Sequence, residues 1–218
     1  MSEVASHERL VEALARDLRP VRPLAPPAWR GGLWCAAVLG LALLILPFAD
    51  LDGMRLRMAV MDLRLSALGA ALTAASAALA AFMTSVPGRS PRWALLPVPP
   101  AALWIGASGI GCLRAWLAPG TDLADAAEMR GCAAILIGLS LPLSFLLLVM
   151  LRRACPLRPV LTAMLGGLAV AAAAATLLVL VHPHDATATD LAVHALAILG
   201  VIGLNALAGG RLLARDPS

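Results

Sequence analysis

Six long apolar runs dominate this sequence and constrain its fold more than any other feature. Each run is long enough to cross roughly 30 Å of hydrocarbon at about 1.5 Å per helical residue. The runs cover residues 31–48, 66–84, 94–113, 131–151, 160–181 and 191–210. None of them contains Asp, Glu, Lys or Arg, and His194 supplies their only imidazole. Because the runs are continuously apolar rather than alternating, they favour membrane-spanning helices over the strands of a β-barrel.

The composition of the chain excludes an ordinary soluble domain. Hydrophobic residues make up 61% of the sequence and charged residues only 14%, which is far from soluble averages. The first apolar run follows five Arg and four Pro, unlike the layout of a cleavable signal peptide. We therefore expect an all-α fold, a six-helix transmembrane bundle that keeps its first span.

The arginines indicate how the bundle is oriented. All 17 basic residues are Arg, and 12 of them lie on the inner side if the N-terminus is cytoplasmic. The positive-inside rule then predicts that both termini lie in the cytoplasm. The predicted parts are a cytoplasmic N-terminal helix and Pro-rich connector (1–30), the six-span domain (31–210) and a cytoplasmic tail (211–218). Since topology accounts for the basic charge, we expect no direct binding of nucleic acid.

The first residues predict a short amphipathic helix that begins after an N-cap at Ser6 and stops at Pro20. Its apolar face holds Leu10, Val11, Leu14 and Leu18. A helix this short is marginal alone in water, so the face needs a partner. The bilayer, the inner surface of the same protein and another protein all remain open. The polar face carries acids as well as bases, which disfavours anionic lipid and favours a protein.

Two arginine-containing loops are expected beside this helix on the cytoplasmic side, at residues 85–93 and 152–159. Arg89 and Arg92 lie in the first loop, next to Trp93 at the depth of the membrane interface. Anchoring of the topology explains both loops. Together they would also form a basic platform beside the N-terminal helix.

The predicted outer face gathers thiols and imidazoles. The candidate sensing residues are Cys112, Cys132, His182 and His184. A disulfide between the two cysteines, a soft-metal site and plain loop residues are the three alternatives. Cys35 and Cys155 are expected at the inner side, where thiols stay reduced.

Two other classes of membrane protein deserve comparison. Gly106-Ala107-Ser108-Gly109 together with His194 suggests an intramembrane serine protease, but the serine lies on the third span and no oxyanion-stabilising pair is evident. A small-molecule or metal permease of the inner membrane is disfavoured because the spans lack charged residues. We therefore expect no enzyme and no catalytic residue.

Four segments of the chain carry a resemblance to a known family. They are Leu10–Val21 (LVEALARDLRPV), Ser85–Trp93 (SVPGRSPRW), Cys155–Pro159 (CPLRP) and Val181–Asp185 (VHPHD). Through these segments the chain resembles the NrsF family of bacterial inner-membrane anti-sigma factors, negative regulators of an ECF sigma factor of the sigma-F type.

This resemblance implies a function at each face. The N-terminal helix would capture the ECF sigma factor in the cytoplasm, and outer cysteines would sense oxidative or heavy-metal stress and release it. Cys132 matches a cysteine of the family, whereas His182 stands where many relatives have Cys. The resemblance therefore leaves Cys112 as a thiol partner, or mixed Cys/His ligation. No resident cofactor is implied beyond a soft metal at this outer cluster.

Overall fold

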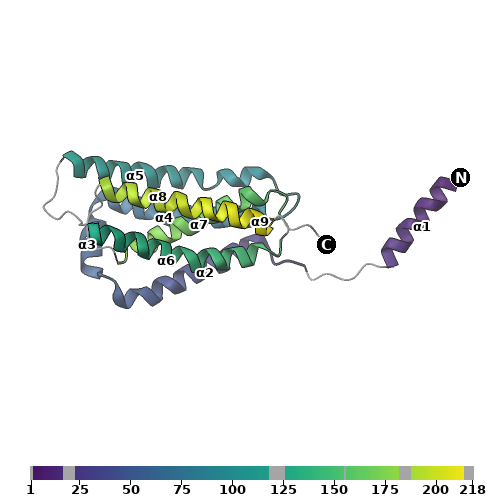
Figure 1. The fold of residues 1–218 in the computed structure, drawn as a ribbon, viewed down its shortest axis with the longest axis horizontal. Helices are drawn as coiled ribbons and strands as arrows, with labels where there is room; N and C mark the ends of the chain where they lie inside the picture. The colour runs from purple at the N-terminus through teal and green to yellow at the C-terminus, as the bar shows by residue number, and fades with distance from the viewer. Residues whose placement is uncertain (1, 17–22, 118–125, 155, 182–187, 214–218) are drawn as a thin grey trace.

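The chain folds into a bundle of long helices with one separate N-terminal helix. The computed structural model describes residues 2–16, 23–117, 126–154, 156–181 and 188–213, and these contain helices and turns but no strand. Figure 1 shows the bundle with α1 (Ser2–Arg16) lying apart from it, near the end where the next helix begins. The expected all-α class is confirmed for the described residues.

The elements follow one another along the chain in an up-and-down order. The bundle helices are α2 (Pro27–Ile45), α3 (Leu51–Ala59), α4 (Met61–Thr84), α5 (Val98–Leu117), α6 (Ala126–Leu151), α7 (Pro159–Leu178), α8 (Ala188–Leu204) and α9 (Gly210–Leu213). The 3₁₀ turns are η1 (Leu46–Phe48) and η2 (Pro91–Leu95), and η3 (Asn205–Gly209) is a π-helical turn. Consecutive long helices pack against each other in the pairs α2–α4, α4–α5, α6–α7 and α7–α8, whereas α5 and α6 have other main neighbours.

Six helical segments are long and apolar enough to cross a membrane. They are Pro27–Phe48, Met61–Thr84, Pro91–Arg114, Ala133–Leu151, Pro159–Leu178 and Ala195–Leu213. Each one overlaps an apolar run identified in the sequence, so the number and the places of the six predicted spans are confirmed. Their length and composition suggest a membrane protein.

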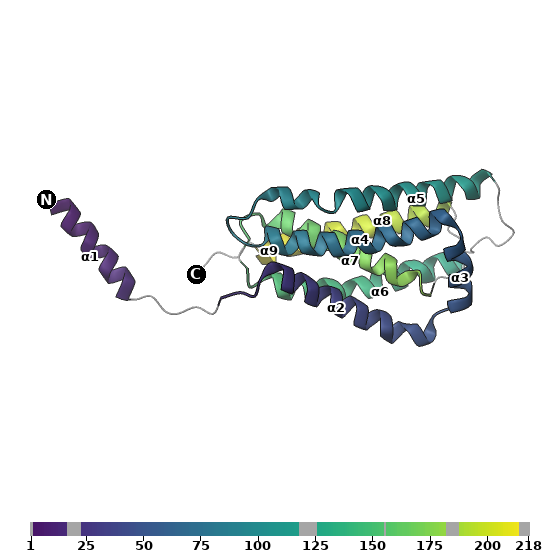
Figure 2. The ribbon, with the colours of Figure 1, turned by 180° about the vertical axis from the view of Figure 1, so that it is seen from behind.

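Helix α7 forms the centre of the bundle. It packs against α4, α6 and α8, while α4 also contacts α2 and α5 (Figures 1 and 2). Inside the bundle, 67% of the α7 window is buried, against 11% for the window in α2. Small side chains explain this position, because Ala171–Ala174 are fully buried and allow neighbouring backbones to approach closely.

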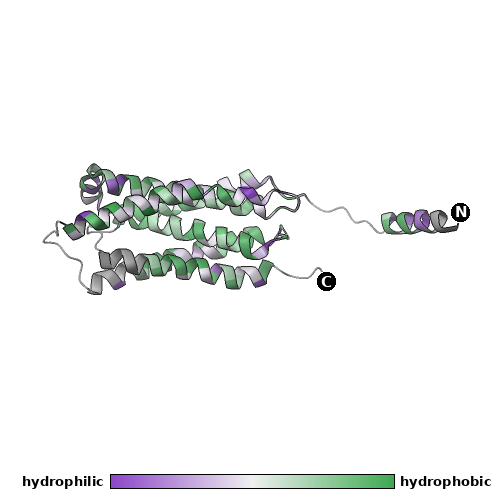
Figure 3. Cartoon of the chain, turned by 90° about the horizontal axis from the view of Figure 1, so that it is seen from above, coloured by the Kyte–Doolittle hydropathy of each residue, from purple (hydrophilic) through white to green (hydrophobic). Residues whose placement is uncertain are grey.

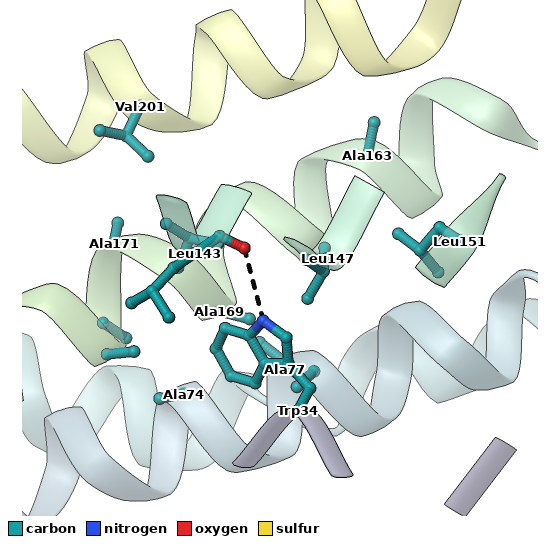
Figure 4. Close-up of a cluster of buried hydrophobic side chains, with 14 of the residues drawn as sticks. Trp34, Ala74, Ala77, Leu143, Leu147, Leu151, Ala163, Ala169, Ala171 and Val201 are labelled. Atoms are coloured by element: carbon teal, nitrogen blue, oxygen red, sulfur yellow. Dashed lines mark hydrogen bonds between the residues drawn. The ribbon is translucent and has the colours of Figure 1, made fainter. Parts of the chain in front are cut away.

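Larger side chains fill the space between α2, α4, α6 and α7. The buried cluster includes Trp34, Phe82, Leu147, Val170 and Leu177. Figure 4 shows the indole of Trp34 between α4 and α6, with Leu143 and Leu147 beside it. Hence α2, although mostly uncovered, inserts one aromatic ring deeply into the bundle.

The bundle has two chemically different ends. We call the end where α2 begins and α6 ends the arm end, and the opposite end, which carries α3, the far end. Apart from α1, the described arginines at the arm end are Arg30, Arg89, Arg92, Arg152, Arg153, Arg158 and Arg211, and the described bundle residues there include no Asp or Glu. The far end carries Asp50, Asp52 and Asp62 together with arginines. Figure 3 shows that apolar residues cover most of the length between these ends.

Several boundaries differ from those expected from the sequence. Helix α1 begins at Ser2 rather than after Ser6, because the residues before Ser6 include no helix breaker. Helix α2 begins at Pro27, so Arg30 belongs to its first turn instead of the connector. Helix α3 and the π-turn η3 were not expected at all.

Candidate functional site

Helix α1 presents apolar side chains that nothing in the bundle covers. Leu10, Val11 and Leu14 are 57%, 63% and 62% exposed. Glu12 and Arg16 form an i,i+4 ion pair at 3.7 Å on the same helix, which supports helix formation by a few tenths of a kcal/mol. The predicted fourth apolar residue, Leu18, lies outside the described residues. The helix therefore has an apolar surface available to a partner.

The first arginine loop is shaped by its turn residues. Gly88 has a φ of 81°, the left-handed conformation that Gly adopts without steric cost. Ser90 then caps η2, since its hydroxyl accepts a hydrogen bond from the backbone N–H of Arg92 at 3.3 Å. Arg89 and Arg92 are both exposed at the arm end, where their charges can meet an acidic partner.

Arg30 is the most unusual charged residue of the arm end, because it is only 7% exposed. Its Nη2 donates to the backbone carbonyl of Met150, and its guanidinium carbon lies 4.8 Å from the centre of the Phe82 ring. The last carbonyls of a helix lack an intrahelical partner, and a cation there complements the helix dipole. Arg30 therefore joins the start of α2 to the end of α6 across the face of α4.

Trp34 makes a second link between the same two helices. Its Nε1 donates to the carbonyl of Leu143 at 3.5 Å, one helical turn deeper than Arg30 (Figure 4). Sequence reasoning missed both contacts. A usable signal was Pro26-Pro27, because Pro is favoured at the first helical position and places Arg30 in the first turn of a helix.

The far end is organised by aspartates. Asp62 on α4 and Arg114 on α5 form an ion pair at 3.1 Å. Asp50 caps α3 by accepting from the N–H of Gly53 at 3.0 Å, and its own N–H donates to the carbonyl of Leu180 at 3.2 Å. These bonds fix α3 against the end of the fifth span and α4 against the third.

The predicted sensing residues are placed only in part. Cys112 is a half-buried free thiol near the end of α5, and Cys132 lies near the start of α6, with a side chain that is not among those described. His182 and His184 lie outside the described residues, as does Cys155. Of the four side chains, the structure describes only that of Cys112, so their joint role stays a prediction.

The helices that carry the two cysteines have different neighbours. Helix α5 packs against α4 and α8, whereas α6 packs against α7, α8 and α2. Within the described part of the chain, no group of three or more His, Cys, Asp or Glu side chains is arranged to hold a metal ion. Cys35, at the other end, is a free thiol packed against the core cluster.

Ser108, the serine of the Gly-Ala-Ser-Gly segment, is used in helix packing. Its hydroxyl lies 2.8 Å from the hydroxyl of Ser66, which joins α5 to α4. A hydroxyl partner of this kind does not act as the base of a nucleophilic serine. The contact thus gives this segment a structural role.

Fold and site together define a class: a helical protein with six membrane-length spans, a separate N-terminal helix and an arginine-rich end. The family model of NrsF, described as negative regulator of sigma F, matches residues 14–214. The chain belongs to this family, and it is thus a negative regulator with a sigma factor as its partner. No curated protein and no solved structure is significantly similar to it.

Proposed function

We propose that this protein is a membrane-embedded anti-sigma factor that binds an ECF sigma factor through its N-terminal region. One observation carries the proposal: α1 stands apart from the bundle and exposes Leu10, Val11 and Leu14. An apolar helix face of this kind suits a groove on a protein partner. Bound in this way, the sigma factor would be kept from RNA polymerase.

The arm end is the cytoplasmic face in this proposal. Its support is the distribution of charge, since the described arginines of the arm end have no acidic neighbours in sequence, whereas the far end is mixed. Arginines accumulate in cytoplasmic loops. Arg89 and Arg92 then lie on the same side as α1, and they would attract acidic side chains of the sigma factor.

Release is proposed to start at the periplasmic face, under oxidative or heavy-metal stress. Cys112 and Cys132 lie near the far-end termini of α5 and α6, and His182 and His184 follow the fifth span in sequence. Thiolates and imidazoles bind soft metals, and thiols are oxidised reversibly. A stimulus acts on the sigma factor only if it stabilises one arrangement of the bundle over another.

Removal of residues 1–24 tests the capture step in cells. A sigma-dependent reporter should become constitutively active, because the apolar face is lost while all six spans remain. Membrane levels of the shortened chain, measured by immunoblot, are the control. Full repression by the shortened chain at normal levels would refute capture by this region.

Replacement of Cys112 and Cys132 by Ser tests the sensing step separately. Basal repression should be retained, and induction of the reporter by cadmium or by an oxidant should be lost. Cys35→Ser is the matched control, since this thiol packs in the core near the arm end. An unchanged response of the double variant would remove both cysteines from the sensor.

A further inference from the structure

We propose that Arg30 is a positioning residue that couples the end of α6 to the start of α2, where residues 1–26, which we call the N-terminal arm, join the bundle. The inference rests on the proposed function, because the arm matters only if it holds the sigma factor. The arm joins the bundle at Pro27, so Arg30 lies in the first helical turn after it. Any displacement of the Met150 carbonyl acts on this turn through the guanidinium.

The attachment of α2 makes such coupling effective. Its window is 11% buried, and it packs mainly on α4 rather than on α6. The polar links to α6 are Arg30 to the Met150 carbonyl and Trp34 to the Leu143 carbonyl. Two donors one helical turn apart on α2 therefore determine how its first turns sit against α6.

The charge of Arg30 is incompletely satisfied in this arrangement. Nη2 has its carbonyl acceptor, but Nη1 is buried and has no acceptor among the described residues. A buried donor without a partner carries the full desolvation penalty. This penalty offsets part of the stabilisation that the Met150 bond provides, and an arrangement in which Arg30 leaves Met150 and reaches solvent removes it.

Helix α6 is suited to transmit a shift along its length. It extends from the Cys132 turn at the far end to Met150 at the arm end, and Pro142 interrupts its hydrogen bonding midway. Interior prolines kink helices and provide a natural bending point. Bending at Pro142 moves the Met150 end relative to the half that carries Cys132.

Arg30→Met removes the contact between Arg30 and the Met150 carbonyl, which we call the latch, and keeps a side chain of similar size in its place. Replacing a buried charge with an apolar side chain of similar size is often neutral or stabilising for the fold. The unfolding temperature of Arg30→Met should therefore equal that of the parent. Nitroxide labels at Leu24 and Leu157, both exposed, report the distance between the arm base and the turn after α6. The labelled protein has its four natural cysteines replaced by Ser.

The expected distance distribution is narrow in the parent and broad in Arg30→Met. Arg211→Met removes the same charge from an exposed site at the same end and should leave the distribution narrow. Arg30→Lys keeps a charge and a donor, so its distance distribution should be narrower than that of Arg30→Met. If Arg30 only filled space, the Lys and Met variants would give equally broad distributions. Equal distributions for Arg30→Met and the parent would overturn the proposal.

A binding cycle tests the coupling with the natural cysteines in place. Pro142→Ala should change the affinity for the sigma factor about fivefold or more, the usual lower range of coupling between sites. In the Arg30→Met background, Pro142→Ala should leave the affinity for the sigma factor unchanged. Additive effects, or no effect of Pro142→Ala on its own, would overturn the latch. If no variant binds the sigma factor while the spin-label result holds, the proposed function fails and the latch stands.

Discussion

Gly69 determines how closely α4 and α5 approach each other. A Cβ at this position would lie 2.7 Å from the backbone N and 2.8 Å from the Cα of Trp104. Backbone atoms cannot rotate away, so Gly69→Ala must push α5 outward. We expect a loss of about 1–3 kcal/mol in the free energy of unfolding, as for other over-packed cores. Thermal unfolding in detergent micelles measures it.

Gly106→Ala is the matched control for this prediction. A Cβ at Gly106, on the partner helix α5, would meet nothing within 4 Å. The free energy of unfolding of Gly106→Ala should therefore not fall, and it should rise by up to about 1 kcal/mol because Ala is the better helix former. Equal unfolding temperatures for the two variants would show that the close crossing at Gly69 is not needed.

Individual contacts were the least predictable feature of the sequence. Leu10, Leu14, Arg89 and Arg92 could be assigned to exposed positions from pattern and loop chemistry alone. The burial of Arg30 could not, because it depends on a carbonyl 120 residues away and on an aromatic ring of α4. Sequence periodicity describes one element, whereas this contact needs three elements in a particular packing.

At the scale of elements, α1 is expected to act through its apolar face. Leu14→Ala should weaken sigma-factor binding about tenfold, since truncation of an anchoring side chain at the centre of an interface costs more than about 1 kcal/mol. Ala is the best helix former, so the helix itself is not weakened. Titration of the purified protein with labelled sigma factor measures the change.

Glu12→Gln serves as the control on the other side of α1. Glu12 is paired with Arg16 in an exposed i,i+4 bridge, and such pairs contribute little to stability. The affinity of Glu12→Gln for the sigma factor should remain close to that of the parent. If Glu12→Gln and Leu14→Ala weaken binding equally, the partner is held by charge rather than by the apolar face.

The spans were predictable because a charge-free apolar run of membrane length can form few structures other than a membrane-spanning helix. Helix α3 was missed although its ends carry helix signals: Asp50 is an N-cap and Arg57 lies in the last turn. Its mixture of charged and apolar residues gives no amphipathic face. The π-turn at Asn205 has no such signal, since it reflects how α8 fits against α6 and α7.

At the scale of the whole molecule, the arm end should face the cytoplasm. A membrane-impermeant maleimide applied to intact spheroplasts should label Leu56→Cys, an exposed residue of α3. It should label Ser90→Cys only after the membrane is permeabilised. Both variants carry Ser at the four natural cysteines. The reverse pattern of labelling would contradict the proposed orientation.

The general architecture followed from the sequence, but the order of the helices in space did not. Apolar runs and arginine positions predict six spans and two unlike ends. Which helix occupies the centre depends on how small residues on different spans match, and α7 takes that place through Ala171–Ala174. Several spans are rich in small residues, so composition alone does not select one of them.

The central claim is that the sigma factor is held by the N-terminal region of a membrane bundle. The most direct measurement is the affinity of the purified sigma factor for the protein in lipid nanodiscs, with and without residues 1–24. The account predicts saturable binding to the full chain and a loss of at least about tenfold in affinity, roughly 1.4 kcal/mol, without residues 1–24. Equal affinity of the two chains would contradict it.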